Sequence, residues 1–489
     1  MQAKNALRVN PLSFSPPQKL LIGYTQKPVL PFGGLLFIAR FFNGLTLAER
    51  LFQVVPHKPT SPLAFNPGEL LVGFVAAVFC GMQRLSHYFR NIPKDVVAQI
   101  LESSGAAAHF VTIGRVFKRI WNETELQQFR AGIWEILRGF FLRLALAPDW
   151  LVFDSTVLTR YGKQEKAEKG YNPSKPGRKS HHPLIASLCE QGFILDIVNR
   201  PGKATASAGI EAVFACALAR ATEIGVGVLG VLADAGFYDE AFLLTLEAAR
   251  TAYIVVVRFY STLKNKVLSL PESAWKTVDD GIAIAEFQWK HAGWTKDRRY
   301  IVVRRDTGKC PDAVGKKLER HEQLALPGLE KGAQYRYSCF VTSLPDEAVQ
   351  VWRQYRRRIL IERQIEDLTY DLGLKKLNTK KWVQTTAMLT MLMLAYNLYH
   401  LFAQTVLPKK DRVKKLSTIR SELFMVGGVI GQSGRDQVLR LSVTEHSFRR
   451  RIEYLFIQIE QAVARLVGNC KTMEDNAAIN SAQNTAMVT

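Results

Sequence analysis

Three acidic residues in this sequence, Asp154, Asp234 and Glu362, are of a type and placement that could bind divalent cations. Asp154 stands within the apolar, β-branched run LVFDSTVL, which predicts a buried strand. Burying a carboxylate is costly unless it is paired or binds a metal ion. The same residue would also fit a capped strand end before a solvated loop, so Asp154 alone leaves both interpretations open.

The other two acids have their own alternatives. Asp234 ends a second apolar run, GVLADAGFY, and the carboxyl end of a strand in an open α/β sheet is where ligands bind. An acid at that place also caps the helix that follows. Glu362 lies in the helical run VWRQYRRRILIERQIEDLTYDLGLKK, on a polar face shared with Tyr355, Arg358 and Glu366. The alternative for that face is exposure to solvent, with a weak i, i+4 pair between Arg358 and Glu362.

Taken together, the three acids are more specific than any one of them. Two strand carboxylates and one helix carboxylate can surround two divalent ions about 4 Å apart. Such ions would activate a water or a 3′-hydroxyl and stabilise the leaving oxygen of a phosphodiester. Carboxylates suit Mg²⁺, and Mn²⁺ accepts the same ligands. We therefore predict that Asp154, Asp234 and Glu362 converge as catalytic and metal-binding residues.

A basic loop follows Asp154 directly. Residues 160–179 contain seven Lys and Arg against two Glu, with two interleaved tyrosines and with prolines and glycines that disfavour regular structure. A possible cation site beside a loop that attracts phosphate points to nucleic acid as the substrate. We predict DNA contacts from this loop and from the helix before Glu362, through Arg160, Lys163, Arg178, Lys179, Tyr355 and Arg358.

The composition supports a polyanionic partner. The chain has 65 Lys and Arg against 43 Asp and Glu, a formal net charge of +22, which favours nucleic acid or an anionic membrane surface. Its six cysteines include no CxxC pair, which is typical of a reducing cytosol. The apolar run 387–407 is long enough to span a membrane, but Asn397, His400 and Gln404 interrupt it, so we predict a buried helix. We expect a cytoplasmic protein without a signal peptide or a membrane partner.

The N-terminal third has helical periodicity. Residues 1 to about 45 contain several prolines and are predicted to be irregular, whereas residues from about 46 onward show apolar positions at helical spacing. We interpret residues 1–148 as a helical DNA-binding region. Within it, residues 95–120 could form a helix-turn-helix with the segment 112–118 as its reading helix, although any two short helices give this pattern.

The pattern changes at residue 149. Three strand-like runs are followed by a helix, a strand, a helix and a strand, the order of the ribonuclease-H-like α/β fold. We assign residues 149–260 to the first part of this core and residues 261–345 to an inserted β-rich subdomain with a polar linker at 309–331. Residues 346–468 hold the second part of the core, including one helix from Glu347 to about Asp371, and a helical C-terminal region. Residues 469–489 are expected to be a disordered tail.

Several runs resemble bacterial insertion-sequence transposases of the DDE class, with the IS-thirteen-eighty family as the nearest group: DSTVLTRYGKQEKAEKGYNPSKPGRKSHHPL, LADAGFYDEAFL, YRRRILIERQIEDLTYDLGLKK and LMLAYNLYHLF. The resemblance covers about Leu151 to Val443. It implies cut-and-paste transposition, in which the protein binds the terminal inverted repeats, cleaves double-stranded DNA and transfers it to target DNA. It also implies two Mg²⁺ or Mn²⁺ ions on the three acids, a homodimer on DNA, and a bacterial cytoplasm with nucleoid association.

This sequence departs from the family pattern at one position. A lysine is expected seven residues after Glu362, and Thr369 stands there; Lys375 and Lys376 are candidates to replace it as DNA contacts. Related enzymes stack a flipped base on an aromatic residue of the insertion. The candidates are Trp289 and Trp294, with core packing as the alternative. Two other functions stay open: a ribonuclease-H-like nuclease without strand transfer, and a DNA-binding protein with an inactive core.

Overall fold

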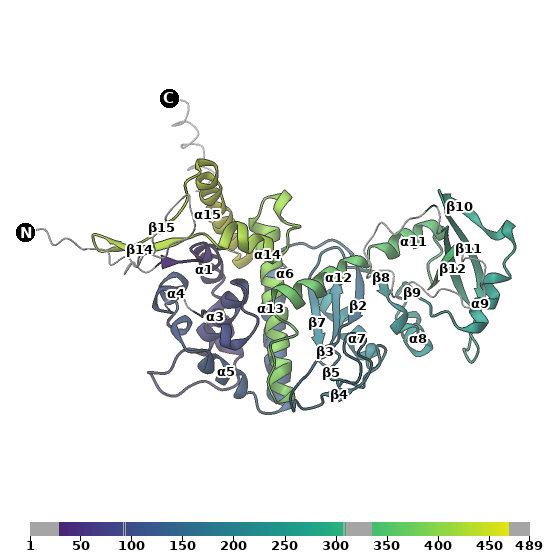
Figure 1. The fold of residues 1–489 in the computed structure, drawn as a ribbon, viewed down its shortest axis with the longest axis horizontal. Helices are drawn as coiled ribbons and strands as arrows, with labels where there is room; N and C mark the ends of the chain where they lie inside the picture. Colours follow the sequence, from purple (N-terminus) through teal and green to yellow (C-terminus); the bar gives the residue numbers. More distant parts are fainter. Residues whose placement is uncertain (1–28, 91, 93, 307–308, 310–334, 469–489) are drawn as a thin grey trace, which may run out of the picture.

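The structure is a computed structural model that describes residues 29–90, 92, 94–306, 309 and 335–468. It is elongated, with the N-terminal helices at one end, a large sheet in the middle and the strands β10 to β12 at the other end (Figure 1). The predictions for residues 1–28, for the linker beyond residue 309 and for the tail 469–489 lie outside the described residues.

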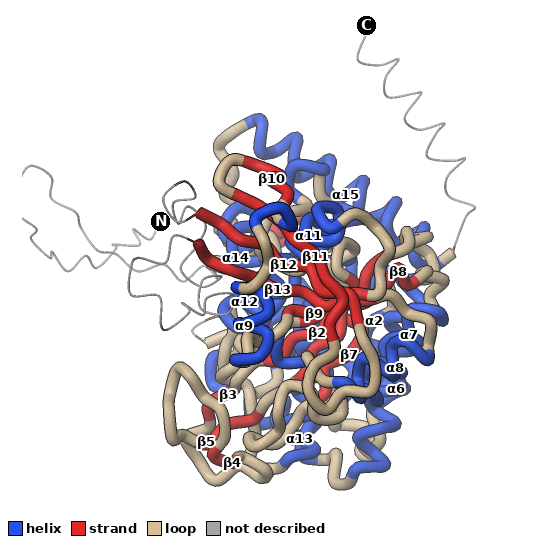
Figure 2. Tube along the Cα trace, turned by 90° about the vertical axis from the view of Figure 1, so that its right-hand side faces the viewer, coloured by secondary structure: helices blue, strands red, loops and turns tan. Residues whose placement is uncertain are grey.

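A nine-stranded mixed sheet runs through the molecule (Figure 2), in the order β10-β11-β12-β13-β9-β8-β2-β6-β7. Its strands are β2 (Asp149–Ser155), β6 (Leu184–Leu188), β7 (Ile194–Val198), β8 (Val228–Ala233), β9 (Tyr253–Val256), β10 (Lys276–Asp279), β11 (Ile282–Trp289), β12 (Arg298–Asp306) and β13 (Tyr335–Thr342). Strands β2, β6 and β7 are antiparallel neighbours, and β8 and β9 add in parallel on the other side of β2. Helices α7 (Ile210–Glu223) and α8 (Glu240–Ala248) make the crossovers. The predicted α/β, ribonuclease-H-like core is confirmed.

The β-rich segment predicted between the second and third acids is present. After helix α9 (Ser261–Leu268), strands β10 to β13 form an antiparallel series, and β13 pairs with β9 through Phe340 and Val256. These strands therefore continue the core sheet instead of forming a sheet of their own. The sequence did not reveal this, because pairing between β9 and β13 is a long-range contact with no local signal.

Side chains of the central strands alternate between two apolar clusters on opposite faces of the sheet. In β2, Trp150 and Val152 belong to one cluster, and Leu151 and Phe153 belong to the other. The first face is covered by helices α11 (Ala348–Arg356) and α12 (Ile359–Glu366), whose Trp352 and Ile361 join its cluster. The second face is covered by α7 and α8. By the same alternation, Asp154 points to the face that α11 and α12 cover.

The same alternation holds in β8. Leu232 lies in the cluster under α11 and α12, whereas Val231 and Ala233 lie in the opposite one. Asp234 lies two residues after Leu232, and side chains two residues apart on a strand point to the same face. Asp234 is therefore also directed to the face of α11 and α12. Two strand acids far apart in the sequence thus reach one face of one sheet.

The single helix predicted from Glu347 to about Asp371 is interrupted. It consists of α11, α12 and a π-helical turn at Asp367–Asp371. Between α11 and α12, Arg358 N–H donates to the Tyr355 carbonyl at 2.9 Å, and Ile361 N–H donates to the Arg358 carbonyl at 3.1 Å. These tight three-residue turns offset the two helices and leave Arg358 at their junction. The segment contains no Gly or Pro that would have indicated the break.

The N-terminal region is helical, as predicted. It comprises α1 (Leu35–Gly44), α2 (Leu47–Val54), α3 (Pro67–Phe79), α4 (Lys94–Leu101), α5 (Phe110–Lys118) and α6 (Glu123–Phe141). The prediction of an irregular chain up to about residue 45 was wrong for α1, because this proline-free segment buries Phe37, Ile38, Phe41 and Phe42. Helices α4 and α5 flank a short 3-10 turn, the order of the predicted helix-turn-helix. Its role in reading DNA stays a prediction.

Helix α13 (Trp382–Val406) lies between the N-terminal helices and the sheet (Figure 1). By length and composition it could cross a membrane, and 94% of its apolar window is buried inside the protein. The side-chain amide of Asn397 donates to the carbonyl of Ile194 at 2.8 Å and accepts from its N–H at 2.9 Å. It thus provides hydrogen-bond partners for the backbone of the edge strand β7. His400 and Gln404 contact the carbonyl of Gln191. The predicted buried helix is confirmed, and its polar residues pin it to the sheet.

The C-terminal part returns to the N-terminal helices. After the short helix α14 (Leu416–Ile419), strands β14 (Gly428–Ser433) and β15 (Asp436–Leu441) form a hairpin that pairs with β1 (Val29–Leu30). Helix α15 (His446–Val467) then packs on α1, with the Phe37 and Phe456 ring centroids 5.1 Å apart. Both ends of the described chain are therefore anchored at the same end of the molecule.

Candidate active site

The three acids meet around one guanidinium group. Arg358 Nη2 lies 3.1 Å from Asp154 Oδ2 and 3.7 Å from Asp234 Oδ2, and its Nη1 lies 3.2 Å from Glu362 Oε1. Because two of these oxygens contact the same nitrogen atom, the two strand carboxylates are close neighbours. The predicted convergence of Asp154, Asp234 and Glu362 is therefore confirmed, while their catalytic and metal-binding roles stay a prediction.

Each carboxylate is fixed by its own element. Asp154 is near the end of β2, and its Oδ1 accepts the N–H of Ser155 at 2.7 Å. Asp234 Oδ1 accepts the N–H of Gly236 at 2.8 Å, so one oxygen caps the short turn after β8 and the other faces Arg358. Helix α8 has a different cap, Asp239. The capping alternative for Asp234 is thus true of one oxygen only, and the second stays available to a cation.

The electrostatics of this cluster favour additional positive charge. Burial raises the pKa of Asp154, Arg358 lowers it, and Asp234 and Glu362 raise it again, to about 7. Burial alone would lower the pKa of Arg358, but Tyr355 and the three carboxylates outweigh it and raise that pKa. Three carboxylates thus share one guanidinium, whose buried Nε has no hydrogen-bond partner in the described part of the chain. The cluster carries more negative charge than its arginine neutralises.

These residues fit a divalent metal site in the chemistry of their donors. All three side chains offer hard carboxylate oxygens, and their side-chain exposures of 14%, 27% and 36% leave a path from solvent. Among the described residues no group of three His, Cys, Asp or Glu is ready-formed for a metal, which agrees with a guanidinium lying between the acids. The cation that now lies between the three carboxylates is the guanidinium of Arg358.

The residues that share a polar face with Glu362 in the sequence have different surroundings in the structure. Tyr355 is buried, with its ring centroid 4.8 Å from that of Phe340, so it lies in the core and not on the surface where a DNA contact was predicted. Arg358, predicted to contact DNA, has the three acids as partners instead. Glu366 lies one turn beyond Glu362, but its Oε2 pairs with Lys415 Nζ at 3.3 Å. Glu362 is therefore the acid of this helix that joins the strand carboxylates.

The residue that stands in place of the expected lysine lies in the π-helical turn after α12. Thr369, seven residues after Glu362, is buried within this turn. A lysine there would bury its charge, which is costly. The next cations, Lys375 and Lys376, are exposed just after the turn. Exposed side chains at this place can contact DNA, and that role of Lys375 and Lys376 stays a prediction.

The two candidate base-stacking residues belong to an aromatic cluster beside β11. The ring of Trp289 lies 5.2 Å from that of Tyr300, and the ring of Trp294 lies 4.7 Å from that of Tyr238. Both tryptophans are partly buried against the main core. The structure therefore gives them packing partners, and their predicted role in base stacking stays a prediction.

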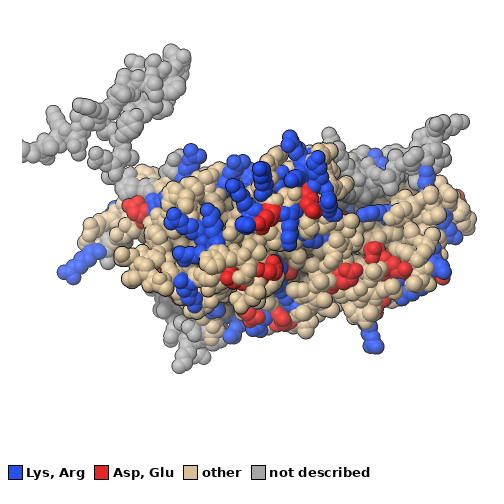
Figure 3. All heavy atoms as spheres, turned by 90° about the horizontal axis from the view of Figure 1, so that it is seen from below, with Lys and Arg blue, Asp and Glu red and all other residues tan. Residues whose placement is uncertain are grey.

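The basic loop is more ordered than its composition suggests. It folds into a small sheet of β3 (Leu158–Thr159), β5 (Lys179–His181) and β4 (Glu168–Lys169) at the lower edge of the molecule in Figure 1. Figure 3 views the molecule from that side, where Lys and Arg side chains gather over the central part. Lys163, Arg178 and Lys179 are exposed, but Arg160 is buried. The exposed three can reach a polyanion, whereas Arg160 needs a separate explanation.

Sequence reasoning missed two residues that contribute to the surroundings of Arg160. Arg84 comes from the loop after α3, and His181 comes from β5. Arg84 had no signal, because a lone arginine between helices is ordinary. His181 follows the basic loop in the sequence, and a histidine beside a strand-like run could have been considered.

A family model and a solved structure are similar to this chain. A family model described as transposase DDE domain group 1 matches residues 28–464. The cryo-EM structure of the piggyBac transposase synaptic complex with hairpin DNA is similar, with a TM-score of 0.45 and 12% sequence identity over 90% of this chain and 88% of that chain. No curated protein matches the chain.

Proposed function

Since the chain belongs to the transposase DDE domain group 1 family, which catalyses DNA cleavage and strand transfer with divalent metal ions, we propose that Asp154, Asp234 and Glu362 hold these ions. The observation that carries the proposal is the meeting of the three carboxylates on the guanidinium of Arg358. We further propose that the ions are two Mg²⁺, with Mn²⁺ as a substitute. A DNA strand is the substrate.

The roles of the chain's own residues follow from their positions. Asp154 and Asp234 are presented by adjacent parallel strands, so the sheet fixes their spacing. Glu362 approaches them from α12, and Arg358 balances one of the three negative charges. Divalent ions bound there supply activation of the attacking water or 3′-hydroxyl and neutralise charge that develops on the phosphoryl group.

The runs around the three acids support a finer placement of the protein. They resemble the IS-thirteen-eighty group of bacterial insertion sequences, so the DNA would be the terminal inverted repeats of such an element and its target. We place the reaction in the bacterial cytoplasm at the nucleoid, carried out by a homodimer on DNA. A search for inverted repeats that flank the gene tests the assignment to an insertion sequence, and light scattering of the DNA complex tests the homodimer.

A matched pair of variants tests the assignment of the acids. Asp234→Asn keeps the hydrogen bond to Gly236 but removes the charge, so DNA binding should persist while cleavage and strand transfer are lost. Asp239→Asn, five residues away, changes only the cap of α8 and should cleave normally. The assay uses duplex DNA carrying an element end, with Mg²⁺ or with EDTA. Equal cleavage by the two variants would exclude Asp234 as a metal ligand.

A further inference from the structure

Arg160 is a buried cation without a carboxylate partner. It is 2% exposed, and no acidic side chain of the described residues lies within ion-pair distance of it. Its Nε donates to His181 Nδ1 at 3.2 Å, and its Nη1 donates to the carbonyl of Lys375 at 3.3 Å. Its Nη2 is buried with no hydrogen-bond partner within the described chain. A buried guanidinium held only by neutral groups is energetically costly unless an anion completes it.

His181 holds this arginine in place as a neutral group. Its Nε2 donates to the carbonyl of Glu165 at 2.9 Å, so its Nδ1 is free to accept from Arg160. Burial lowers the pKa of His181, and Arg160 lowers it further, to about 4. The imidazole is therefore uncharged near neutral pH. His181 is a positioning residue that supports the guanidinium without neutralising its charge.

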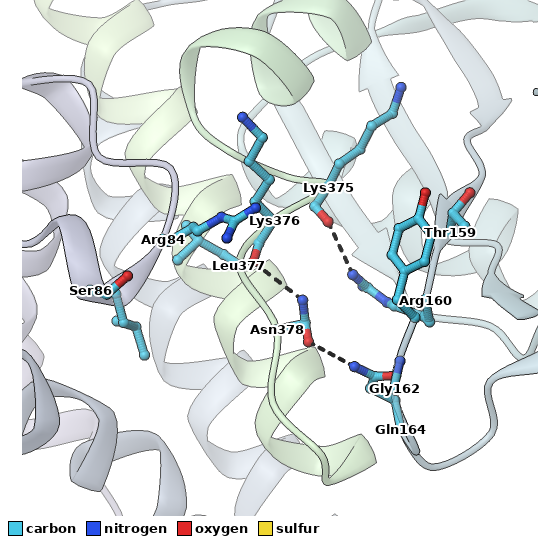
Figure 4. A pocket seen from close by; sticks show the side chains of 12 residues that line it. Arg84, Ser86, Thr159, Arg160, Gly162, Gln164, Lys375, Lys376, Leu377 and Asn378 are labelled. Atoms are coloured by element: carbon cyan, nitrogen blue, oxygen red, sulfur yellow. Dashed lines mark hydrogen bonds between the residues drawn. The ribbon is translucent and has the colours of Figure 1, made fainter.

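Arg160 lines a cavity of about 390 Å³ between three parts of the chain (Figure 4). The N-terminal region, the basic loop and the segment after the π-helical turn all contribute. Of the twelve residues that line it, none is acidic and four are cations, namely Arg84, Arg160, Lys375 and Lys376. The cavity therefore concentrates positive charge.

Hydrogen bonds between its walls hold the cavity open. Gln164 Nε2 donates to Asn378 Oδ1 at 3.2 Å, which joins the basic loop to the segment after the π-helical turn (Figure 4). Gln83 Nε2 donates to the carbonyl of Tyr370 at 2.7 Å, and Lys376 Nζ donates to Gln83 Oε1, which joins the N-terminal region to the π-helical turn and to the segment after it. The walls are therefore positioned before any ligand enters, which lowers the cost of binding.

The cavity is close to the acid cluster along the chain. Arg160 follows Asp154 by six residues, and six residues span at most about 20 Å. One strand of DNA rises about 3.4 Å per nucleotide along the helix axis, so this reach corresponds to roughly six nucleotides. A strand of about this length that is bound at the acid cluster is long enough to reach the cavity.

We propose that this cavity is a phosphate site for the DNA strand near the cleaved bond, with Arg160 as its buried anchor and Arg84 and Lys375 at its sides. Arginine is suited to this role because its planar guanidinium matches phosphate oxygens. The proposal rests on the proposed function, since it takes DNA as the substrate. Because the site joins the N-terminal region to the core, a bound phosphate would hold both parts on the same DNA.

Salt dependence of DNA binding tests the site without relying on cleavage. The variant Arg84→Gln/Lys375→Gln removes two exposed charges at the cavity, and Lys276→Gln/Arg250→Gln removes two exposed charges elsewhere. One phosphate contact contributes a slope of about −0.9 to log K against log salt, or roughly a tenfold loss of affinity at about 0.1 M salt. We expect this loss and a flatter slope in the first variant only. Equal effects of the two variants would overturn the proposal.

A second experiment identifies the phosphate and its source. Single phosphates of a duplex with the element end are replaced in turn by neutral methylphosphonates. In the wild type, one position within about six nucleotides of the cleaved bond should weaken binding, and that position should have no effect in Arg84→Gln/Lys375→Gln or in Arg160→Gln. Sensitivity that persists in both variants would contradict the proposal, as would tight binding of inorganic phosphate that DNA does not displace. Cleavage by wild type in Mg²⁺ separately monitors the proposed function.

Discussion

Two buried arginines, Arg358 beside Asp154 and Arg160 six residues further along the chain from Asp154, have opposite surroundings. Arg358 contacts three carboxylates, whereas Arg160 contacts none in the described part of the chain. The first site has an excess of negative charge and the second an excess of positive charge. In our proposals a ligand of the missing sign completes each site, a divalent cation in one case and a phosphate in the other. Phosphoryl transfer on DNA brings both ligands at once.

The comparison also shows how each site uses its elements. The acid cluster is built on the sheet and a helix, which suits the proposed metal site, since the spacing of metal ligands must be maintained closely. The basic cavity is built from loops and a short three-stranded sheet, joined by hydrogen bonds between side chains such as Gln164 and Asn378. A phosphate site tolerates such walls, since it positions the strand and forms no bonds in the reaction.

The largest expected effect comes from removing one charge of the acid cluster. Glu362→Gln keeps the size of the side chain, and DNA binding should be retained. Cleavage should fall by about a hundredfold or more, because stabilisation of the transition state depends on the bound ions. Glu366→Gln is the matched control, since Glu366 pairs with Lys415 and not with Arg358. If Glu366→Gln loses cleavage and Glu362→Gln does not, the third acid has been assigned one turn too early.

Replacing each arginine by methionine should separate the two sites in protein stability. Arg358→Met leaves three carboxylates without their cation and should lower the free energy of unfolding by about 3 kcal/mol. Mg²⁺ should recover part of this loss, because a ligand of the folded state stabilises it. Arg160→Met leaves the acceptors on His181 and Lys375 unsatisfied, but it also removes a buried charge that has no anion; because these effects offset each other, stability should change by less than about 1 kcal/mol. Urea unfolding in EDTA and in Mg²⁺ measures both. A similar loss in the free energy of unfolding of the two variants would contradict the opposite charge balance of the two sites.

A smaller effect is expected from pH, through His181. Its pKa in the folded protein is about 4, below the usual 6.5, so the unfolded chain binds a proton first as the pH falls. Stability contributed by neutral His181 is therefore complete above about pH 6.5 and is lost as the pH falls toward 4. At about pH 5.5 the loss is about 1.4 kcal/mol. His181→Gln should lack this component, so the wild type and variant should differ in slope between these pH values. Parallel curves would contradict the neutral state of His181.

Local patterns in the sequence were sufficient for the strands and for the candidate acids. The apolar run around Asp154 and the run before Asp234 predicted buried strands, and alternation along each strand directs both acids to the face of α11 and α12. The order of strands and helices predicted the core. These features depend on neighbours in the sequence, so they can be inferred without a structure.

The remaining features depend on contacts between distant segments. The break before α12 places Arg358 among the acids, and no Gly or Pro in the sequence indicates it. The cavity joins Arg84 to Lys375, which lie 291 positions apart in the sequence, and its other wall is Arg160. The burial of Arg160 and Tyr355 likewise follows from tertiary packing. A basic loop predicts attraction to phosphate, but not which of its cations is buried.

The most direct test of the central claim is a count of metal ions bound to the protein–DNA complex. Electron paramagnetic resonance of free Mn²⁺, in a titration of the complex, gives the number of ions bound and their affinity. The wild type and the control Asp239→Asn should bind Mn²⁺ equally, whereas Asp154→Asn should bind it at least about a hundredfold more weakly or lose an ion. If Asp154→Asn binds as many ions as the wild type with the same affinity, the three converging carboxylates are not the metal site.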